Sequence, residues 1–90
     1  YAIKKNWNNA DLEGCLFIDS ILNNSSFEQT DLYAADFSRS EMRHCIFKGA
    51  NLSKTDFEDC DLTGADFRGA MIDATTSFKN AILTDAKLDR

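Results

Sequence analysis

A large apolar residue recurs at every fifth position of this chain, and this period constrains the fold more than any other feature. The series runs without a gap from Trp7 to Ile72, skips one residue, and resumes at Phe78. Five residues advance an α-helix by about 500°, so the series would spiral around a helix instead of forming one apolar face. In an unbroken strand an odd period alternates between the two faces. The period keeps one face inward only if the chain turns a corner once in every unit.

Each unit also has a fixed internal order. A small residue precedes the large one by two positions, as Ala65 precedes Phe67. Residues two apart in an extended segment point to the same side, so both should face inward. The residue between them is often Asp, Asn or Glu and should point outward, where its side chain can accept hydrogen bonds from corner N–H groups. All four glycines follow a large residue by two positions, where a tight corner suits them.

Phenylalanine alternates with Leu, Met or Ile along the series, so residue type repeats every ten residues. If four units close one coil of about 20 residues, two Phe columns oppose each other and two aliphatic columns fill the other sides. At the sheet spacing of about 4.8 Å, roughly four and a half coils would form a rod about 20 Å long. The expected core contains Phe17, Phe27, Phe37, Phe47, Phe57, Phe67, Phe78, Leu12, Leu32, Leu52 and Leu62.

The units "ANLSK", "TDFED", "CDLTG" and "ADFRG" resemble those of the pentapeptide-repeat family, whose consensus unit is A-(D/N)-L-x-x. The resemblance implies an all-β fold, a right-handed four-sided (quadrilateral) parallel β-helix solenoid of about four coils. We expect residues 1–9 to form an N-terminal cap or lead-in. Residues 10–90 should form the pentapeptide-repeat β-helix, with a one-residue phase shift near 73–78.

The two ends of such a solenoid need cover, because each coil buries its core only against its neighbours. The chain starts without Met and its last residues supply no cap. We therefore expect a piece of a larger protein, or an end-to-end or face-to-face homodimer.

The charge balance, the short apolar runs and the cysteines indicate which partners and which cellular compartment to expect. The chain has 10 Lys and Arg against 15 Asp and Glu, which argues against direct binding of nucleic acid or an anionic membrane. No apolar run is long enough to span a bilayer. Cys15, Cys45 and Cys60 all take the small inward position, in three different columns, and are expected to be free buried thiols. Free thiols and the mostly bacterial family together predict a cytoplasmic location.

Two short motifs resemble functional sites, a catalytic Cys–His dyad and a calcium-binding loop. His44 precedes Cys45, but the cysteine should point inward and the histidine should lie on an outer corner, so they cannot act as a dyad. The segment "DCDLTG" imitates the start of a calcium loop, but position twelve would be Ala70 instead of the required Glu. We therefore expect no enzyme, no cofactor and no metal site.

One local deviation predicts an interface. Leu16, Ile18 and Ile21 take outward positions that other units give mainly to polar residues. A local apolar group of this kind indicates a contact. Either the N-terminal segment folds back over the trio, or the trio binds another molecule.

The preferred function is a non-enzymatic protein-binding or scaffold module with an unidentified protein partner. The alternative, which the family resemblance implies, is a DNA mimic that binds a type II topoisomerase such as DNA gyrase and protects it from quinolones. Six outward acidic residues carry the negative charge that DNA mimicry requires: Asp11, Asp31, Asp36, Asp56, Asp61 and Asp66. A duplex 20 Å long carries roughly 12 charges, whereas this chain has a net charge of −5.

Overall fold

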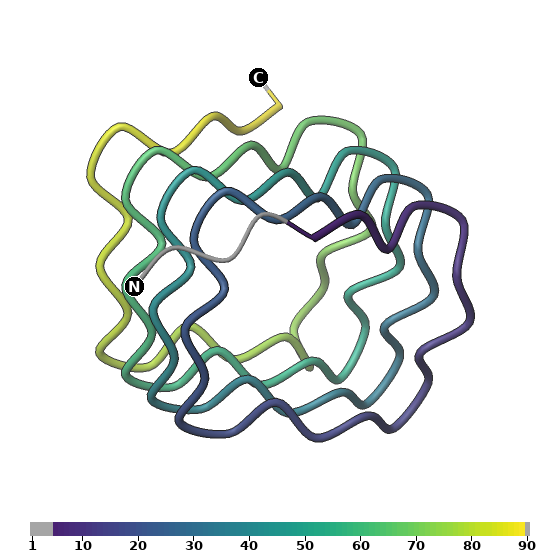
Figure 1. The fold of residues 1–90 in the computed structure, drawn as a ribbon, viewed down its shortest axis with the longest axis horizontal. Coiled ribbons are helices and arrows are strands. Elements are labelled where there is room, and N and C mark those ends of the chain that lie inside the picture. Colours follow the sequence, from purple (N-terminus) through teal and green to yellow (C-terminus); the bar gives the residue numbers. More distant parts are fainter. Residues whose placement is uncertain (1–4, 90) are drawn as a thin grey trace.

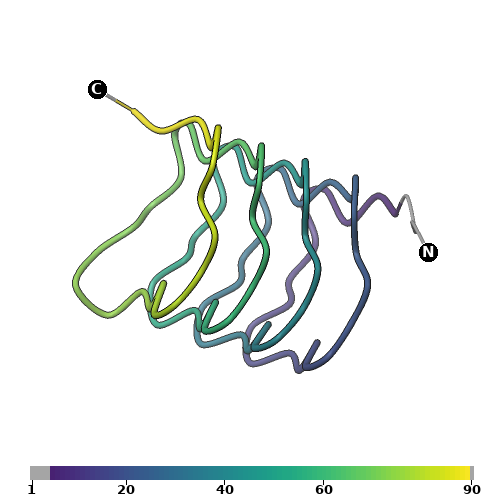
Figure 2. The same ribbon diagram turned by 90° about the vertical axis from the view of Figure 1, so that its left-hand side faces the viewer.

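The computed structural model describes residues 5–89, which form a four-sided solenoid. Within this range there is no helix and no strand of several residues. The backbone pairs instead through isolated parallel β-bridges between residues 20 or 21 positions apart. Figure 1 shows the coils along the solenoid axis, and Figure 2 shows them stacked, with the purple N-terminal and yellow C-terminal coils at opposite ends. The Cα atoms extend 19 Å along the shortest axis, close to the expected rod length.

The bridges define four sides, which are numbered here in chain order. The first side contains Asn6, Ser26, Ile46, Asp66 and Lys87; the second Asp11, Asp31, Asn51 and Met71; the third Leu16, Asp36, Asp56 and Ser77; the fourth Ile21, Glu41, Asp61 and Ile82. The first side thus starts at Asn6, inside the segment expected as a lead-in. Residues 1–4 of that segment, and any cap they form, lie outside the described residues.

The extra residue of the series lies in the corner that follows Ile72. Bridged residues are 20 apart up to Asn51↔Met71 and 21 apart from Asp56↔Ser77 onward. In ordinary corners the carbonyl of the large residue accepts the N–H three positions later. Here the carbonyl of Asp73 accepts the N–H of Thr76 (3.1 Å). The Asp73 carboxylate accepts a bond from the Thr75 N–H within the corner (2.9 Å). It also accepts one from the Ser53 hydroxyl (2.5 Å), which joins the longer corner to the coil before it.

Aromatic rings fill the axis of the solenoid. Phe37 stacks on Phe57 with ring centroids 5.4 Å apart, and Phe47 stacks on Phe67 at 5.1 Å. Rings of the two columns meet edge to face across the axis, as Phe47 and Phe57 do at 5.4 Å and 79°. Both arrangements are favoured by the ring quadrupole. The two Phe columns of the sequence pattern therefore lie on opposite sides and touch.

Burial follows position along the stack. The fully buried members of the expected core lie in the middle coils: Phe27, Phe37, Phe47, Phe57, Phe67, Leu32, Leu52 and Leu62. Leu12, Phe17 and Phe78 are partly buried, because each has a neighbouring coil on one side only. At the C-terminal end the inward residues Ile72, Leu83 and Leu88 are also exposed.

Every five-residue corner from Asn9 to Asp85 brings one residue into the left-handed region, whereas the longer corner after Ile72 does not. In most corners the N–H of the small residue donates to the carbonyl of the large residue before it, as Cys60 does to Phe57 (3.1 Å). The second corner residue has φ between 57° and 76°, which suits the four glycines. The same conformation is imposed on residues that disfavour it, including Ala34, Arg39 and Lys54. Closure of the coil thus overrides local preference.

Candidate functional site

The sequence motifs that resemble catalytic chemistry lie apart in the structure. Residues 5–89 enclose no pocket. His44 lies exposed on a corner, whereas Cys45 is buried and its thiol donates to the carbonyl of Leu22 (3.0 Å). Burial raises the pKa of the Cys45 thiol to about 12, so it is no nucleophile at neutral pH.

All three cysteines are free thiols. The Cys60 thiol donates to the carbonyl of Phe37 (2.8 Å), and burial raises its pKa to about 11. Cys15 lies in the first coil and is only partly buried. Cys45 and Cys60 therefore act as small core residues that also donate a hydrogen bond.

Most of the predicted acidic residues accept hydrogen bonds from backbone N–H groups in the corners. The carboxylate of Asp56 accepts the backbone N–H of Glu58 (2.8 Å), and Asp36 does the same for Ser38 (2.9 Å). The same contact occurs at Asp11, Asp31 and Asp61. Side-chain caps of this kind satisfy corner donors, so the periodic acids have a structural reason that is independent of any ligand.

Asp66, one of the six outward acids of the sequence pattern, is largely covered by a neighbouring arginine. Its residue exposure is only 8%, and Arg68 covers its carboxylate at 2.7 Å. The hydrogen bond from Arg68 lowers the pKa of Asp66 to about 2. Lys48 lowers this pKa further. Asp66 is the only acid among the bridge residues that the structure describes on the first side, so this side carries no acidic stripe.

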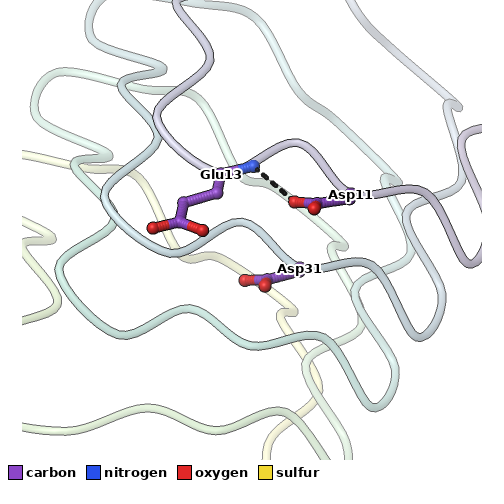
Figure 3. A group of neighbouring side chains, drawn as sticks. All are labelled: Asp11, Glu13 and Asp31. Atoms are coloured by element: carbon purple, nitrogen blue, oxygen red, sulfur yellow. Dashed lines mark hydrogen bonds between the residues drawn. The ribbon is translucent and has the colours of Figure 1, made fainter.

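The second side holds the densest group of carboxylates. Asp11, Glu13 and Asp31 come from two adjacent coils and bring carboxylate oxygens within 4.8 Å of one another (Figure 3). The Glu13 N–H donates to Asp11 (3.2 Å). None of the ion pairs found within residues 5–89 involves these three side chains. Their charge is therefore uncompensated by the described part of the chain.

The predicted apolar trio is exposed on the first coil. Leu16 is 73% exposed, Ile18 38% and Ile21 36%. Leu16 bridges Asp36 on the third side, and Ile21 bridges Glu41 on the fourth, so the trio surrounds one corner at the N-terminal end. Sequence alone identified these residues because the period assigns them outward positions.

Backbone groups beside the trio lack a backbone partner among residues 5–89. In interior coils the residue at the bridge position directs both N–H and C=O toward the preceding coil, as Asp36 bonds to Cys15 and Phe17. For Asp11, Leu16 and Ile21 neither group has a backbone partner among residues 5–89. The coil numbering, which only the structure supplies, shows that the apolar trio and these backbone groups coincide.

The C-terminal end carries a second group of exposed apolar residues. Met71 and Ile82 are outward residues of the last coil, 58% and 50% exposed. They lie beside the exposed inward residues Ile72 and Leu83. The sequence could have indicated this group, because Met71 and Ile82 both lie within 20 residues of Leu88, the last large residue of the five-residue series.

Comparison with known proteins gives a family and a fold. The model of the pentapeptide repeat region matches residues 10–90. No curated protein sequence matches the chain. Among solved structures, the pentapeptide repeat protein Rfr23 of the cyanobacterium Cyanothece 51142 has a TM-score of 0.56 at 14% identity, covering 94% of this chain and 88% of that one.

Two further structures are less similar. A pentapeptide repeat protein from the thylakoid lumen of Arabidopsis thaliana is 24% identical, covering 91% of this chain and 63% of that one, with a TM-score of 0.40. Trypsin-treated QnrB1, a plasmid-mediated fluoroquinolone resistance protein, is 22% identical, covering 94% and 48%, with a TM-score of 0.41. This chain thus spans about half to two thirds of the length of these two proteins. Within residues 5–89 no helix has the length and apolarity needed to cross a membrane.

Proposed function

The chain belongs to the pentapeptide-repeat family, and we propose that it is a non-enzymatic protein-binding or scaffold module. We infer that its solenoid is the right-handed quadrilateral parallel β-helix of that family. The observation that carries the proposal is the apolar trio Leu16, Ile18 and Ile21 on an otherwise polar first coil. An exposed apolar group on a rigid scaffold is typical of a contact surface.

Three further features support a binding role over catalysis. The described surface has no pocket, the buried thiols are protonated at neutral pH, and the periodic carboxylates cap corners. The proposed location is the bacterial cytoplasm, where a reducing environment would keep the three thiols free.

A DNA mimic that binds a type II topoisomerase is the second candidate. The Asp columns of the second and third sides favour it, because they place like charges on adjacent coils. The amount of negative charge argues against mimicry. A duplex as long as the 19 Å solenoid carries about 11 phosphate charges, whereas this chain has a net charge of −5.

Affinity capture from a lysate of the source organism tests both candidates. The baits are the wild type, the triple variant Leu16→Asp, Ile18→Asp, Ile21→Asp, and the matched control Ile82→Asp at the opposite end of the fourth side. A protein retained by the wild type and Ile82→Asp but lost by the triple variant supports the binding module. A topoisomerase subunit retained by all three baits supports mimicry. No specific protein on any bait contradicts both.

A further inference from the structure

We propose that the solenoid pairs with a second copy of itself through the fourth side, with the two solenoid axes antiparallel. This inference rests on the proposed protein-binding function and names the partner of Ile18 and Ile21 as the same chain. The contact uses outward side chains of the fourth side and of the corner before it. It uses no backbone group at either end of the stack.

The fourth side has the same kinds of residue in the same order from either end. Its bridge residues run Ile21, Glu41, Asp61 and Ile82, one coil apart. Ile21 is 36% exposed and Ile82 is 50% exposed. A twofold axis between Glu41 and Asp61, perpendicular to the solenoid axis, brings Ile21 opposite Ile82 of the second copy and Ile82 opposite its Ile21. Equal coil spacing keeps all four positions in register, and such a reciprocal contact is the commonest symmetry of homodimers.

The corner before the fourth side carries complementary charges. Backbone bonds between successive coils align its second positions into one column, which runs Asp19, Arg39, Asp59 and Asn80. The same twofold axis brings Arg39 opposite Asp59 of the second copy, and Asp59 opposite its Arg39. Within one copy Arg39 pairs with Asp19 (2.9 Å), whereas none of the ion pairs found within residues 5–89 involves Asp59. The two copies thus present opposite charges at matched positions, which favours this register.

Ile18 extends the apolar contact onto the same corner. It is 38% exposed and precedes Asp19, just as the exposed Lys79 precedes Asn80 in the last coil of the column. The twofold axis places Ile18 opposite Lys79 of the second copy. The lysine stem can cover the isoleucine while the ammonium group stays in water.

The centre of the contact opposes pairing. The axis brings Glu41 of one copy opposite Asp61 of the other, and like charges at facing positions repel. The Arg43 guanidinium lies 3.9 Å from Asp61 in the same copy and offsets part of this charge. The Asn23 amide donates to the Glu41 carboxylate (3.4 Å), a bond that a glutamine oxygen can also accept. Removal of the Glu41 charge should therefore strengthen pairing, which a contact through another face would not predict.

Sedimentation equilibrium of the whole chain measures pairing. We expect a reversible monomer–dimer equilibrium, in which Ile21→Asp and Ile82→Asp each weaken the dimer at least tenfold. Glu41→Gln should strengthen it severalfold. Met71→Asp is the matched control, because Met71 is an exposed apolar residue of the second side, on the opposite face of the solenoid. It should leave the equilibrium unchanged.

Exchange of one charge pair tests the register. Arg39→Asp and Asp59→Arg should each weaken the dimer at least tenfold, because each places like charges opposite one another. The double variant Arg39→Asp, Asp59→Arg should restore most of the affinity. It exchanges two residues that both have φ of 60°, so each side chain enters a backbone conformation that its type already adopts in this chain. Urea denaturation of each variant verifies that the monomer is folded.

A wild type that stays monomeric up to about 1 mM would overturn the proposal. So would a dimer that none of these variants alters. A dimer that Leu83→Asp dissociates and Ile82→Asp does not would assign the contact to the end of the stack. A double variant as weak as the two single variants would exclude the antiparallel register. If the chain is monomeric while affinity capture finds a partner that depends on the trio, the binding function stands and its partner is a different protein.

Discussion

The side-chain hydroxyl of Thr55 donates to the carbonyl oxygen of Leu32, 23 residues earlier, over 2.8 Å. The same contact recurs from Ser40 to Phe17, from Thr76 to Leu52 and, through a thiol, from Cys60 to Phe37. It joins the small residue of one coil to the large residue of the preceding coil. From Thr30 onward, each Ser, Thr or Cys at the small position therefore donates a hydrogen bond to the preceding coil.

Thr55→Val tests the energetic contribution of that bond. The substitution keeps the side-chain shape but removes the donor, while the Leu32 carbonyl retains the bond from the Ala35 N–H (2.9 Å). We expect the free energy of unfolding to fall by about 1 kcal/mol in urea denaturation. Thr55→Ser, which keeps the hydroxyl, should cost less. A Val variant as stable as the wild type would show that the bond adds nothing.

Phe47→Ala tests the aromatic core. Phe47 is fully buried and stacks between Phe27 and Phe67, so its loss leaves a cavity in the middle of a column. The expected cost is about 3–5 kcal/mol in the same denaturation experiment. Phe17→Ala, in the half-buried first coil, is the control and should cost clearly less. A cost below about 1 kcal/mol for Phe47→Ala would contradict the stacked core.

The cysteines should differ in reactivity. With iodoacetamide at pH 8, Cys15 should be modified first, because burial raises the pKa of the Cys45 and Cys60 thiols to about 12 and about 11. Mass spectrometry of the folded protein over time checks the order. Modification of Cys45 or Cys60 as fast as Cys15 would rule out their sealed environment.

The same thiols predict a loss of stability in alkali. Above a pKa of 9.0 the unfolded thiols ionise while the folded ones stay protonated, so stability should fall from about pH 9 toward pH 12. The stability of the double variant Cys45→Ala, Cys60→Ala should fall less steeply with pH, because it lacks the two thiols. Alanine is tolerated at this position of the unit, as Ala35, Ala50 and Ala65 show. Parallel slopes for the two proteins would exclude a contribution from the thiols.

Asp66 predicts a loss of stability in acid. Its pKa lies at about 2 in the folded protein against 3.8 as the ordinary value, so its contribution is present above pH 3.8 and is lost as the pH falls toward 2. Asp66→Asn should reduce this dependence while still capping the Arg68 N–H, as Asn51 caps Ser53 (3.1 Å). Thermal unfolding between pH 5 and pH 2 measures the difference. An unchanged pH dependence in the variant would contradict the assignment.

Alanine substitutions at Gly14 and Gly64 distinguish the cost of backbone strain from the cost of a steric clash. Both have φ of +71°, but a Cβ at Gly14 meets nothing within 4 Å, whereas a Cβ at Gly64 would lie 2.5 Å from the His44 ring. Gly14→Ala should cost about 1 kcal/mol and Gly64→Ala more, with part of the difference recovered in Gly64→Ala, His44→Ala. Equal costs for the two single variants would show that His44 moves aside freely.

The sequence alone determined the repeat, the inward positions and the alternation of Phe with aliphatic residues. These follow from local order, because a five-residue period admits only a chain that turns once per unit. The outward trio Leu16, Ile18 and Ile21 followed from the same rule. So did the role of aspartates such as Asp56 as corner caps, since the accepting oxygen and the donating N–H are only two residues apart.

The tertiary structure decided everything that depends on which coils lie side by side. The bond from Thr55 to Leu32, the cover of Asp66 by Arg68 and the contact of His44 with the position above Gly64 have no local signature. The left-handed conformation of Ala34 opposes its own preference. It persists because the Ala34 N–H donates to the Ser53 carbonyl of the next coil (3.0 Å), while the adjacent Tyr33 carbonyl accepts the Gly14 N–H of the coil before (2.9 Å). That the backbone groups of Leu16 have no backbone partner among residues 5–89 likewise becomes visible only when the coils are counted.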